Sequence, residues 1–182
     1  GIRDRDVTGV QTCALPIFTP DGRYTIVFNG EIYNHGELRA DLETKGYVYR
    51  SRTDTETILY GYREYGPAFF QRMVGMWAIA IWDEHKQQLL CSRDRIGVKP
   101  LYYYHRNGVF VFGSEIKSIL KHPDVRASMS EQQLPVYLAL SATSDTDTLF
   151  EGIKKLPAGH HMRLTDDGSL SVERYWSPLP AS

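Results

Sequence analysis

The string Asn29-Gly30-Glu31 holds the residues best suited to chemistry, and it follows a run of β-branched and aromatic residues. That run predicts a buried strand over residues 24–29, with the chain turning at its end. Gly lets a ligand come close to backbone N–H groups. An Asn side-chain amide beside a free Gly N–H would give a pair of donors for an oxyanion. The alternative is a plain Gly turn that the Asn side chain stabilises.

Asp54 is a second candidate, because it lies in the first turn of a predicted helix. Thr53 and Glu56 spell a T-x-x-E capping box, in which each side chain satisfies a backbone N–H of that turn. A carboxylate there is favoured by the helix dipole and commonly has no other role. It could instead receive the ammonium group of a ligand.

A third candidate is the charged connection SRDRIGVKPLYY over residues 92–103. Gly97 and Pro100 interrupt it, and it lies between two predicted hairpins. Loops of this composition are either solvated turns or surfaces that face another subunit. Spacing alone favours a structural role for Arg93, Asp94 and Lys99.

The cysteines and histidines do not predict a metal site. Cys13 and Cys91 form no C-x-x-C motif and have no metal-like spacing to the six histidines. The neighbours His160 and His161 would point to opposite faces of a strand. Cys91 follows two leucines, which is typical of a thiol that packs as a small buried hydrophobe. We expect no metal ion.

Composition argues against several classes of function. The 182 residues carry 21 Lys and Arg against 22 Asp and Glu, a net charge of −1. This balance gives no overall field that would attract nucleic acid or anionic lipid. Hydrophobic residues make up 42%, and no apolar run approaches the roughly 20 residues that cross a bilayer. We expect a globular cytoplasmic protein with no nucleic-acid partner and no membrane partner.

The elements that must position these candidates follow from the residue pattern. Helices are expected over residues 37–45, from Thr53 through Tyr65, over 67–73, near 115–121, and from the Ser130-x-x-Gln133 capping box onward. Strands are expected over residues 24–29, 47–51, 76–82, 88–93, 101–105 and 109–112, and two more flank a turn at 166–169. Asn107-Gly108 is a strong hairpin signal. Strands in the middle with helices on both sides indicate a layered α+β domain.

Residues 1–18 look foreign to the rest of the chain. They show no sustained strand or helix period and begin without Met. Residues 5–17 (RDVTGVQTCALPI) resemble the peptide that sequencing-adapter DNA encodes when it is joined to a truncated reading frame. We expect a non-native segment and leave it out of the fold prediction. The alternative is a genuine N-terminal strand.

Six strings, taken in order, resemble the glutamine amidotransferase domain of glutamine-hydrolysing asparagine synthetases. They are VFNGEIYNHGELR (27–39), SRTDTETIL (51–59), GMWAIAIWD (75–83), RDRIGVKPLYYY (93–104), FGSEIKSIL (112–120) and KLPAGHHMRL (155–164). The resemblance covers about residues 19–176. It implies an α+β fold of the N-terminal-nucleophile hydrolase type, a four-layer αββα sandwich that is incomplete because its first strands are missing.

The resemblance also implies roles for the candidate residues. In this family an N-terminal Cys attacks the side-chain amide of glutamine, and its own α-amino group serves as the base. Asn29 and the Gly30 N–H are then expected to stabilise the oxyanion. Glu31 and Asp54 are expected to hold the α-amino end of glutamine, which favours a binding role for Asp54 over a purely structural one.

The sequence departs from the family at both ends. No Cys stands at position 1 or 2, and Cys13 is internal, so we expect the nucleophile to be absent and the polypeptide to be inactive as a glutaminase. The Arg that grips the substrate carboxylate is also missing. No S-G-G-x-D-S string, the family's pyrophosphate loop for ATP, occurs before Ser182.

These departures set the expected domain organisation. Residues 1–18 are expected to be non-native, 19–165 to form a partial type 2 glutamine amidotransferase domain, and 166–182 to begin a linker towards an absent synthetase domain. The expected partners are glutamine and that domain, which would use ATP and Mg, and the parent could be a homodimer. No cofactor is expected in this part. A related amidotransferase with another acceptor and a non-catalytic glutamine-binding domain remain open as alternatives.

Overall fold

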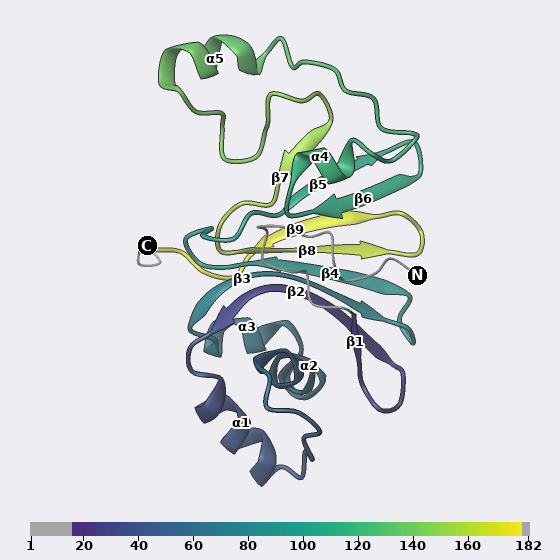
Figure 1. The fold of residues 1–182 in the computed structure, drawn as a ribbon, viewed down its shortest axis with the longest axis vertical. Helices are drawn as coiled ribbons and strands as arrows, with labels where there is room; N and C mark the ends of the chain where they lie inside the picture. Colours follow the sequence, from purple (N-terminus) through teal and green to yellow (C-terminus); the bar gives the residue numbers. More distant parts are fainter. Residues whose placement is uncertain (1–15, 180–182) are drawn as a thin grey trace, which may run out of the picture.

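Two antiparallel sheets, stacked face to face, form the centre of the protein (Figure 1). The computed structural model describes residues 16–179. Sheet A consists, in spatial order, of β1 (Ile17–Phe18), β2 (Tyr24–Ile32), β3 (Gly75–Asp83), β4 (Gln88–Arg93), β8 (His160–Thr165) and β9 (Leu170–Arg174). Sheet B has the spatial order β6 (Val109–Gly113), β5 (Tyr102–Arg106) and β7 (Ile153–Lys155).

Helices cover the outer faces of both sheets. On sheet A lie α1 (His35–Thr44), α2 (Asp54–Tyr65), the single turn η1 (Gly66–Ala68) and α3 (Phe69–Arg72), and on sheet B lies the short α4 (Ile116–Ile119). A further helix, α5 (Gln133–Leu140), stands apart from these layers (Figure 1). No helix within residues 16–179 is long and apolar enough to cross a membrane.

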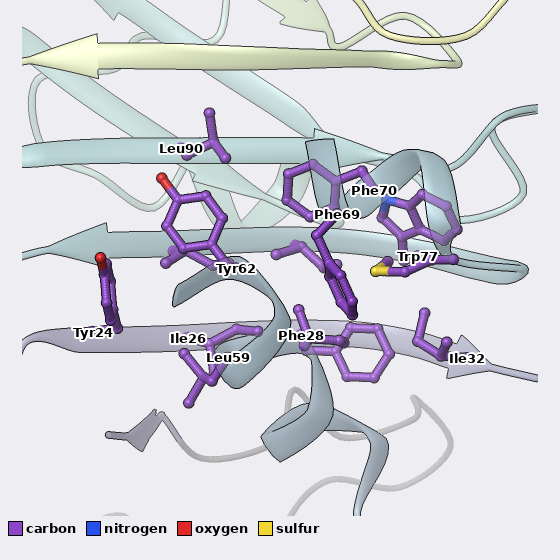
Figure 2. Close-up of a cluster of buried hydrophobic side chains, with 14 of the residues drawn as sticks. Tyr24, Ile26, Phe28, Ile32, Leu59, Tyr62, Phe69, Phe70, Trp77 and Leu90 are labelled. Atoms are coloured by element: carbon purple, nitrogen blue, oxygen red, sulfur yellow. The ribbon is translucent and has the colours of Figure 1, made fainter. Parts of the chain in front are cut away.

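Three hydrophobic clusters fill the spaces between successive layers. The first joins α2 and α3 to sheet A, with Phe69 and Trp77 fully buried in it (Figure 2). The second joins the two sheets and contains Cys91 and Tyr103. The third joins sheet B to α4 through Ile119. The order of layers is therefore α, β, β, α, and the predicted layered α+β fold is confirmed.

Both hairpins predicted in the middle of the chain are present. β3 pairs with β4, and β5 pairs with β6. In the second hairpin, Asn107 and Gly108 both have positive φ angles, 52° and 74°. Two consecutive left-handed residues are what the tight turn of a two-residue hairpin requires.

Three local predictions were wrong. The strand expected over residues 24–29 continues to Ile32, because β3 pairs with its whole length. Residues 47–51 form no strand, and no side chain caps α2 at Thr53. Glu56 instead accepts hydrogen bonds from the backbone N–H groups of Arg50 and Ser51, at 2.8 and 2.7 Å. The carboxylate therefore holds the connecting segment against the start of α2.

The helix expected from the Ser130-x-x-Gln133 box forms without a side-chain cap, and it is preceded by Gln132. Its start is stabilised by backbone hydrogen bonds alone, because the N–H groups of Gln133 and Leu134 donate to the Ser130 carbonyl. The helix predicted from the Ser130-x-x-Gln133 box is therefore present, but the side-chain cap that the box predicted does not form.

The structure describes only part of the two terminal segments. Ile17 and Phe18 form β1 and pair with Ile26 and Thr25, whereas residues 1–15 of the segment expected to be non-native lie outside the described residues. At the other end, β9 pairs along its length with β8. The boundary that we expected at 165/166 therefore falls inside the β8–β9 hairpin.

A buried ion pair at the end of β3 leads to a prediction about pH. Arg23 donates from Nε and Nη2 to the two Asp83 carboxylate oxygens, both at 3.1 Å, and the backbone N–H groups of His85 and Lys86 donate to the same carboxylate. Burial alone would raise the pKa of Asp83, but the Arg23 and backbone hydrogen bonds outweigh it and the pKa is lowered.

A carboxyl whose pKa is lowered by folding stabilises the fold above its ordinary value and loses that contribution as the pH falls through the folded pKa. We therefore expect urea unfolding to show a loss of stability below about pH 4. The Asp83→Asn variant should be less stable at pH 7 and should lose less on acidification. Parallel declines of the two proteins between pH 7 and pH 3 would contradict this assignment.

Candidate functional site

β2 carries Asn29, Gly30 and Glu31 along one end of sheet A. Gly30 lies opposite Trp77 of β3, and Glu31 lies opposite Met76. Side chains alternate between the two faces of a strand, so Asn29 and Glu31 share the face that Val27 presents towards sheet B. The buried Phe28 and Ile32 face the helices.

Gly30 occupies a backbone position that only glycine fits. Its φ angle is 155°, in the region that other residues avoid, and a Cβ placed on it would run into the Met76 carbonyl. Gly75 stands in the matching place on β3, where a Cβ would meet the Glu31 carbonyl. Each of the two glycines therefore lies against the backbone of the opposite strand, and neither position has room for a Cβ.

The backbone N–H of Gly30 points to the outer edge of β2. The N–H of Tyr33 donates to the Val74 carbonyl on the β3 side, whereas the N–H of Ile32 points away from β3. In an antiparallel ladder the direction alternates from residue to residue, so Gly30 shares the direction of Ile32. Within residues 16–179, β1 pairs only with Thr25 and Ile26, which leaves no strand opposite Gly30.

Asp54 meets the same edge from the first residue of α2. Its Oδ2 accepts the hydrogen bond from the Ile32 N–H at 3.0 Å. This contact joins the helix start to the end of β2 and leaves Oδ1 for another donor. Asp54 is only partly buried. The structure thus brings Asp54 beside the string Asn29-Gly30-Glu31, although the two are more than twenty residues apart in sequence.

Asn29 is held by a residue that sequence reasoning did not assign. Its Nδ2 donates to the Ser114 Oγ at 3.1 Å, from sheet A across to the end of β6 on sheet B. Both residues line a cavity of about 230 Å³ between the sheets. Ser114 lies in the string FGSEIKSIL, but nothing in the local pattern pairs it with a residue 85 positions away. Of the two N–H bonds on Nδ2, one remains for a ligand.

Glu31 is exposed, and no other side chain holds it within the described residues. Of the four predicted site residues, three are therefore consecutive on β2, and Asp54 joins them through Ile32. Two donors, the Gly30 N–H and the Asn29 amide, and two carboxylates therefore lie at the same end of sheet A. Such a set can bind an amino group and stabilise a developing negative charge on oxygen.

Within the charged connection at residues 92–103, Arg93 and Asp94 have structural roles, as spacing indicated. Asp94 is fully buried, and its carboxylate accepts four backbone N–H bonds, from Trp77 and from three residues of its own loop. Arg93 donates to the carbonyls of Gly97, Lys99 and Leu156 at 2.8 Å each. These two residues close the loop against sheet A.

This arrangement predicts a large loss of stability for Asp94→Asn. An Asn side chain has one acceptor oxygen and would turn its amide donors toward two of the four N–H groups. Two buried donors left without partners should lower the free energy of unfolding by roughly 3 kcal/mol. Urea unfolding measures this, with the exposed Asp166→Asn as the matched control, which should change little. Equal midpoints for the two variants would contradict the structural role.

Cys91 is a buried packing residue, as expected. It lies in β4 between β3 and β8, is 1% exposed, and belongs to the cluster between the sheets. Burial raises the pKa of its thiol to about 12, so the thiolate that a nucleophile requires does not form near neutral pH. His160 and His161 follow each other in β8, and within residues 16–179 no group of His, Cys, Asp and Glu is arranged to hold a metal ion.

Comparisons with known proteins place this geometry in context. The chain matches the glutamine amidotransferase domain family over residues 3–176. It is 39% identical over 155 residues to asparagine synthetase [glutamine-hydrolyzing] 3 of Bacillus subtilis, covering 85% of this chain and 25% of that protein. It is 36% identical to a putative asparagine synthetase [glutamine-hydrolyzing] 2 of Methanocaldococcus jannaschii, covering 85% of this chain and 30% of that protein. The chain thus spans between a quarter and a third of the length of these relatives.

A solved structure shares the fold. The glutamine phosphoribosylpyrophosphate amidotransferase from B. subtilis superposes with a TM-score of 0.61 at 18% identity, covering 89% of this chain and 31% of that chain. This similarity supports the fold alone. The predicted αββα sandwich of the N-terminal-nucleophile hydrolase type is confirmed.

Proposed function

Because the chain belongs to the glutamine amidotransferase domain family, we propose that it binds glutamine at the Asn29–Asp54 site and is the glutamine-handling part of a longer asparagine synthetase. The observation that carries this proposal is the hydrogen bond from the Ile32 N–H to Asp54. It brings a carboxylate to the strand edge on which the Gly30 N–H lies, so one ligand can contact both.

We assign the roles from the direction of each group. Asp54 and Glu31 hold the α-amino group of glutamine, because carboxylates form charge-assisted hydrogen bonds with ammonium groups. The Gly30 N–H and the remaining Asn29 Nδ2 hydrogen stabilise the oxyanion that forms when the side-chain amide is attacked. Ser114 accepts the other Nδ2 hydrogen and so fixes the orientation of the Asn29 amide.

The longer protein would pass the released ammonia to an aspartate activated with ATP and Mg. These groups belong to the synthetase part, which we propose follows this domain, and no step in the present domain needs them. Aspartate, glutamine and ATP are metabolites of the cytoplasm, where we place the protein. The similarity to asparagine synthetases favours this acceptor over those of other amidotransferases.

We propose that the 182-residue polypeptide itself binds glutamine without hydrolysing it. A nucleophilic Cys of this type needs its own terminal amine as the base, and residue 1 is Gly. Cys91 is buried, and Cys13 has no free amine and lies outside the described residues. Glutamate release from glutamine should therefore be no faster than in buffer.

A gain-of-function experiment tests this proposal. Residues 1–18 are replaced by the N-terminal segment of B. subtilis asparagine synthetase 3 with a cysteine as its first residue, and glutamate release is measured. We expect hydrolysis to begin, and to be lost when that cysteine is changed to alanine. Equal glutamate release by the original polypeptide would contradict the assignment of the nucleophile.

A further inference from the structure

A further cavity lies away from the glutamine site, on the opposite edge of sheet A. It measures about 660 Å³, and Arg95, Ile96, Lys155, Arg174, Trp176 and Leu179 are among the residues that line it. Trp176 to Leu179 follow β9 after Tyr175, so the segment after the last strand runs along this cavity.

The cavity carries a strong positive charge. Arg93, Arg95, Lys155 and Arg174 line it together with one carboxylate, that of Asp145. Each nitrogen of the Arg93 guanidinium donates to a carbonyl, whereas Arg174 is exposed and the Arg95 Nε is buried without a partner in the described part of the chain. Burial, with repulsion from Arg93, lowers the pKa of Lys155. An acidic group placed here would relieve this concentration of positive charge.

Exposed apolar side chains border the charged cavity. Ile96 and Leu179 line it and are each 75% exposed. On the other side, the segment that leaves α5 contributes Asp145 to the wall, and Thr143 accepts a hydrogen bond from the Lys155 Nζ at 3.0 Å. None of the α5 residues is buried. Exposed apolar side chains mark surfaces that bind other proteins, and a positively charged patch beside them favours a partner that carries negative charge.

The cavity is also linked to the glutamine site through the backbone. Trp77, which lies opposite Gly30, accepts the Asp94 N–H at 2.9 Å and donates its own N–H to the Asp94 carboxylate. Asp94 in turn holds the turn that presents Arg95 and Ile96. A domain bound in the cavity would therefore stand at the same end of sheet A as the glutamine site.

We propose that this cavity and its apolar border are the docking surface for the synthetase part of the longer protein, and that this part places carboxylates against Arg95, Lys155 and Arg174. The inference rests on the proposed function. The relatives supply the occupant, because about three quarters of the B. subtilis protein lies outside the match, and the segment after the last strand runs along this surface. A second copy is disfavoured, because a twofold interface here would place the basic groups against themselves.

Hydrogen exchange tests the proposal. The longer protein, obtained by extending the reading frame beyond Ser182, is compared with the 182-residue polypeptide. Backbone amides of residues 95–98 and of Trp176, Ser177 and Leu179 should exchange at least about tenfold more slowly in the longer protein, since docking buries them. The double variant Ile96→Asp, Arg174→Glu should remove this protection. The control Arg126→Glu, an exposed arginine on a different part of the surface, should retain it.

The outcomes separate this inference from the proposed function. Equal exchange in the two proteins, with glutamine binding intact, would overturn the docking surface and leave the function standing. Protection that appears in the 182-residue polypeptide as its concentration rises would overturn it in favour of a second copy. Loss of glutamine binding in both proteins would instead contradict the proposed function. Protection of these amides in the longer protein that the double variant abolishes would support the docking surface.

Discussion

The Asp54→Asn variant is expected to bind glutamine about tenfold to a hundredfold more weakly than the original polypeptide, which corresponds to the loss of one charge-assisted hydrogen bond. The physical reason lies in the different roles of the two carboxylate oxygens, because only Oδ1 is left to contact the ligand. Oδ2 accepts the Ile32 N–H, and an Asn oxygen can take over that contact. What the variant loses is the negative charge that faces the substrate's amino group. Isothermal titration with L-glutamine measures the change.

The matched control for this variant is Asp166→Asn, which removes one exposed carboxylate from the β8–β9 turn at the other end of sheet A. It should bind glutamine as the original polypeptide does. Asp54→Asn should also unfold at nearly the same urea concentration, because its helix-start contact survives. Unchanged affinity in a folded Asp54→Asn protein would show that the carboxylate serves only the start of α2.

Gly30→Ala is expected to have the largest effect on stability, lowering the free energy of unfolding by roughly 4 kcal/mol. Two costs add at this position. The φ angle of 155° is unfavourable for any residue with a Cβ, and that Cβ would press against the backbone carbonyl of Met76 rather than against a side chain that could move. The β2–β3 pair would have to separate where the glutamine site lies.

Gly36→Ala provides the comparison for this change. Gly36 lies in the first turn of α1, has an ordinary φ, and would place its Cβ in open space. Alanine also has the higher helix propensity, so this variant should be as stable as the original protein or slightly more so. Comparable stabilities of Gly30→Ala and Gly36→Ala in urea unfolding would contradict the lack of room for a Cβ at Gly30.

The sequence predicted helices, strands and turns well where a few adjacent residues determine them. The Asn107-Gly108 turn, the apolar β3 run and the burial of Cys91 each follow from a few adjacent residues. Sequence reasoning ended β2 too early, because the polar residues Asn29 and Glu31 are typical of a turn. Their place in the strand is set by pairing with β3, which lies more than forty residues further along the chain.

The candidate residues of the site could be predicted from the sequence, but not the hydrogen bonds that join them to the rest of the fold. Family resemblance supplied the candidate residues, and only the fold shows which of them lie together. Asp54 reaches β2 through the Ile32 N–H, and Asn29 reaches sheet B through Ser114. Glu56 was predicted to cap α2, but its carboxylate binds the backbone of Arg50 and Ser51 instead, in a segment with no regular structure. Contacts of this kind depend on how layers stack, and no sequence period encodes them.

The location of the glutamine site can be measured directly by amide NMR of the ¹⁵N-labelled polypeptide during titration with L-glutamine. The backbone amide of Gly30 and the side-chain amide of Asn29 should shift and saturate together, at one dissociation constant, and the exposed amides around Asp166 should not move. The same titration of Asp54→Asn should need far more glutamine. Saturable shifts that leave Gly30 and Asn29 unaffected would show that glutamine binds elsewhere, and that this edge of β2 is not the site.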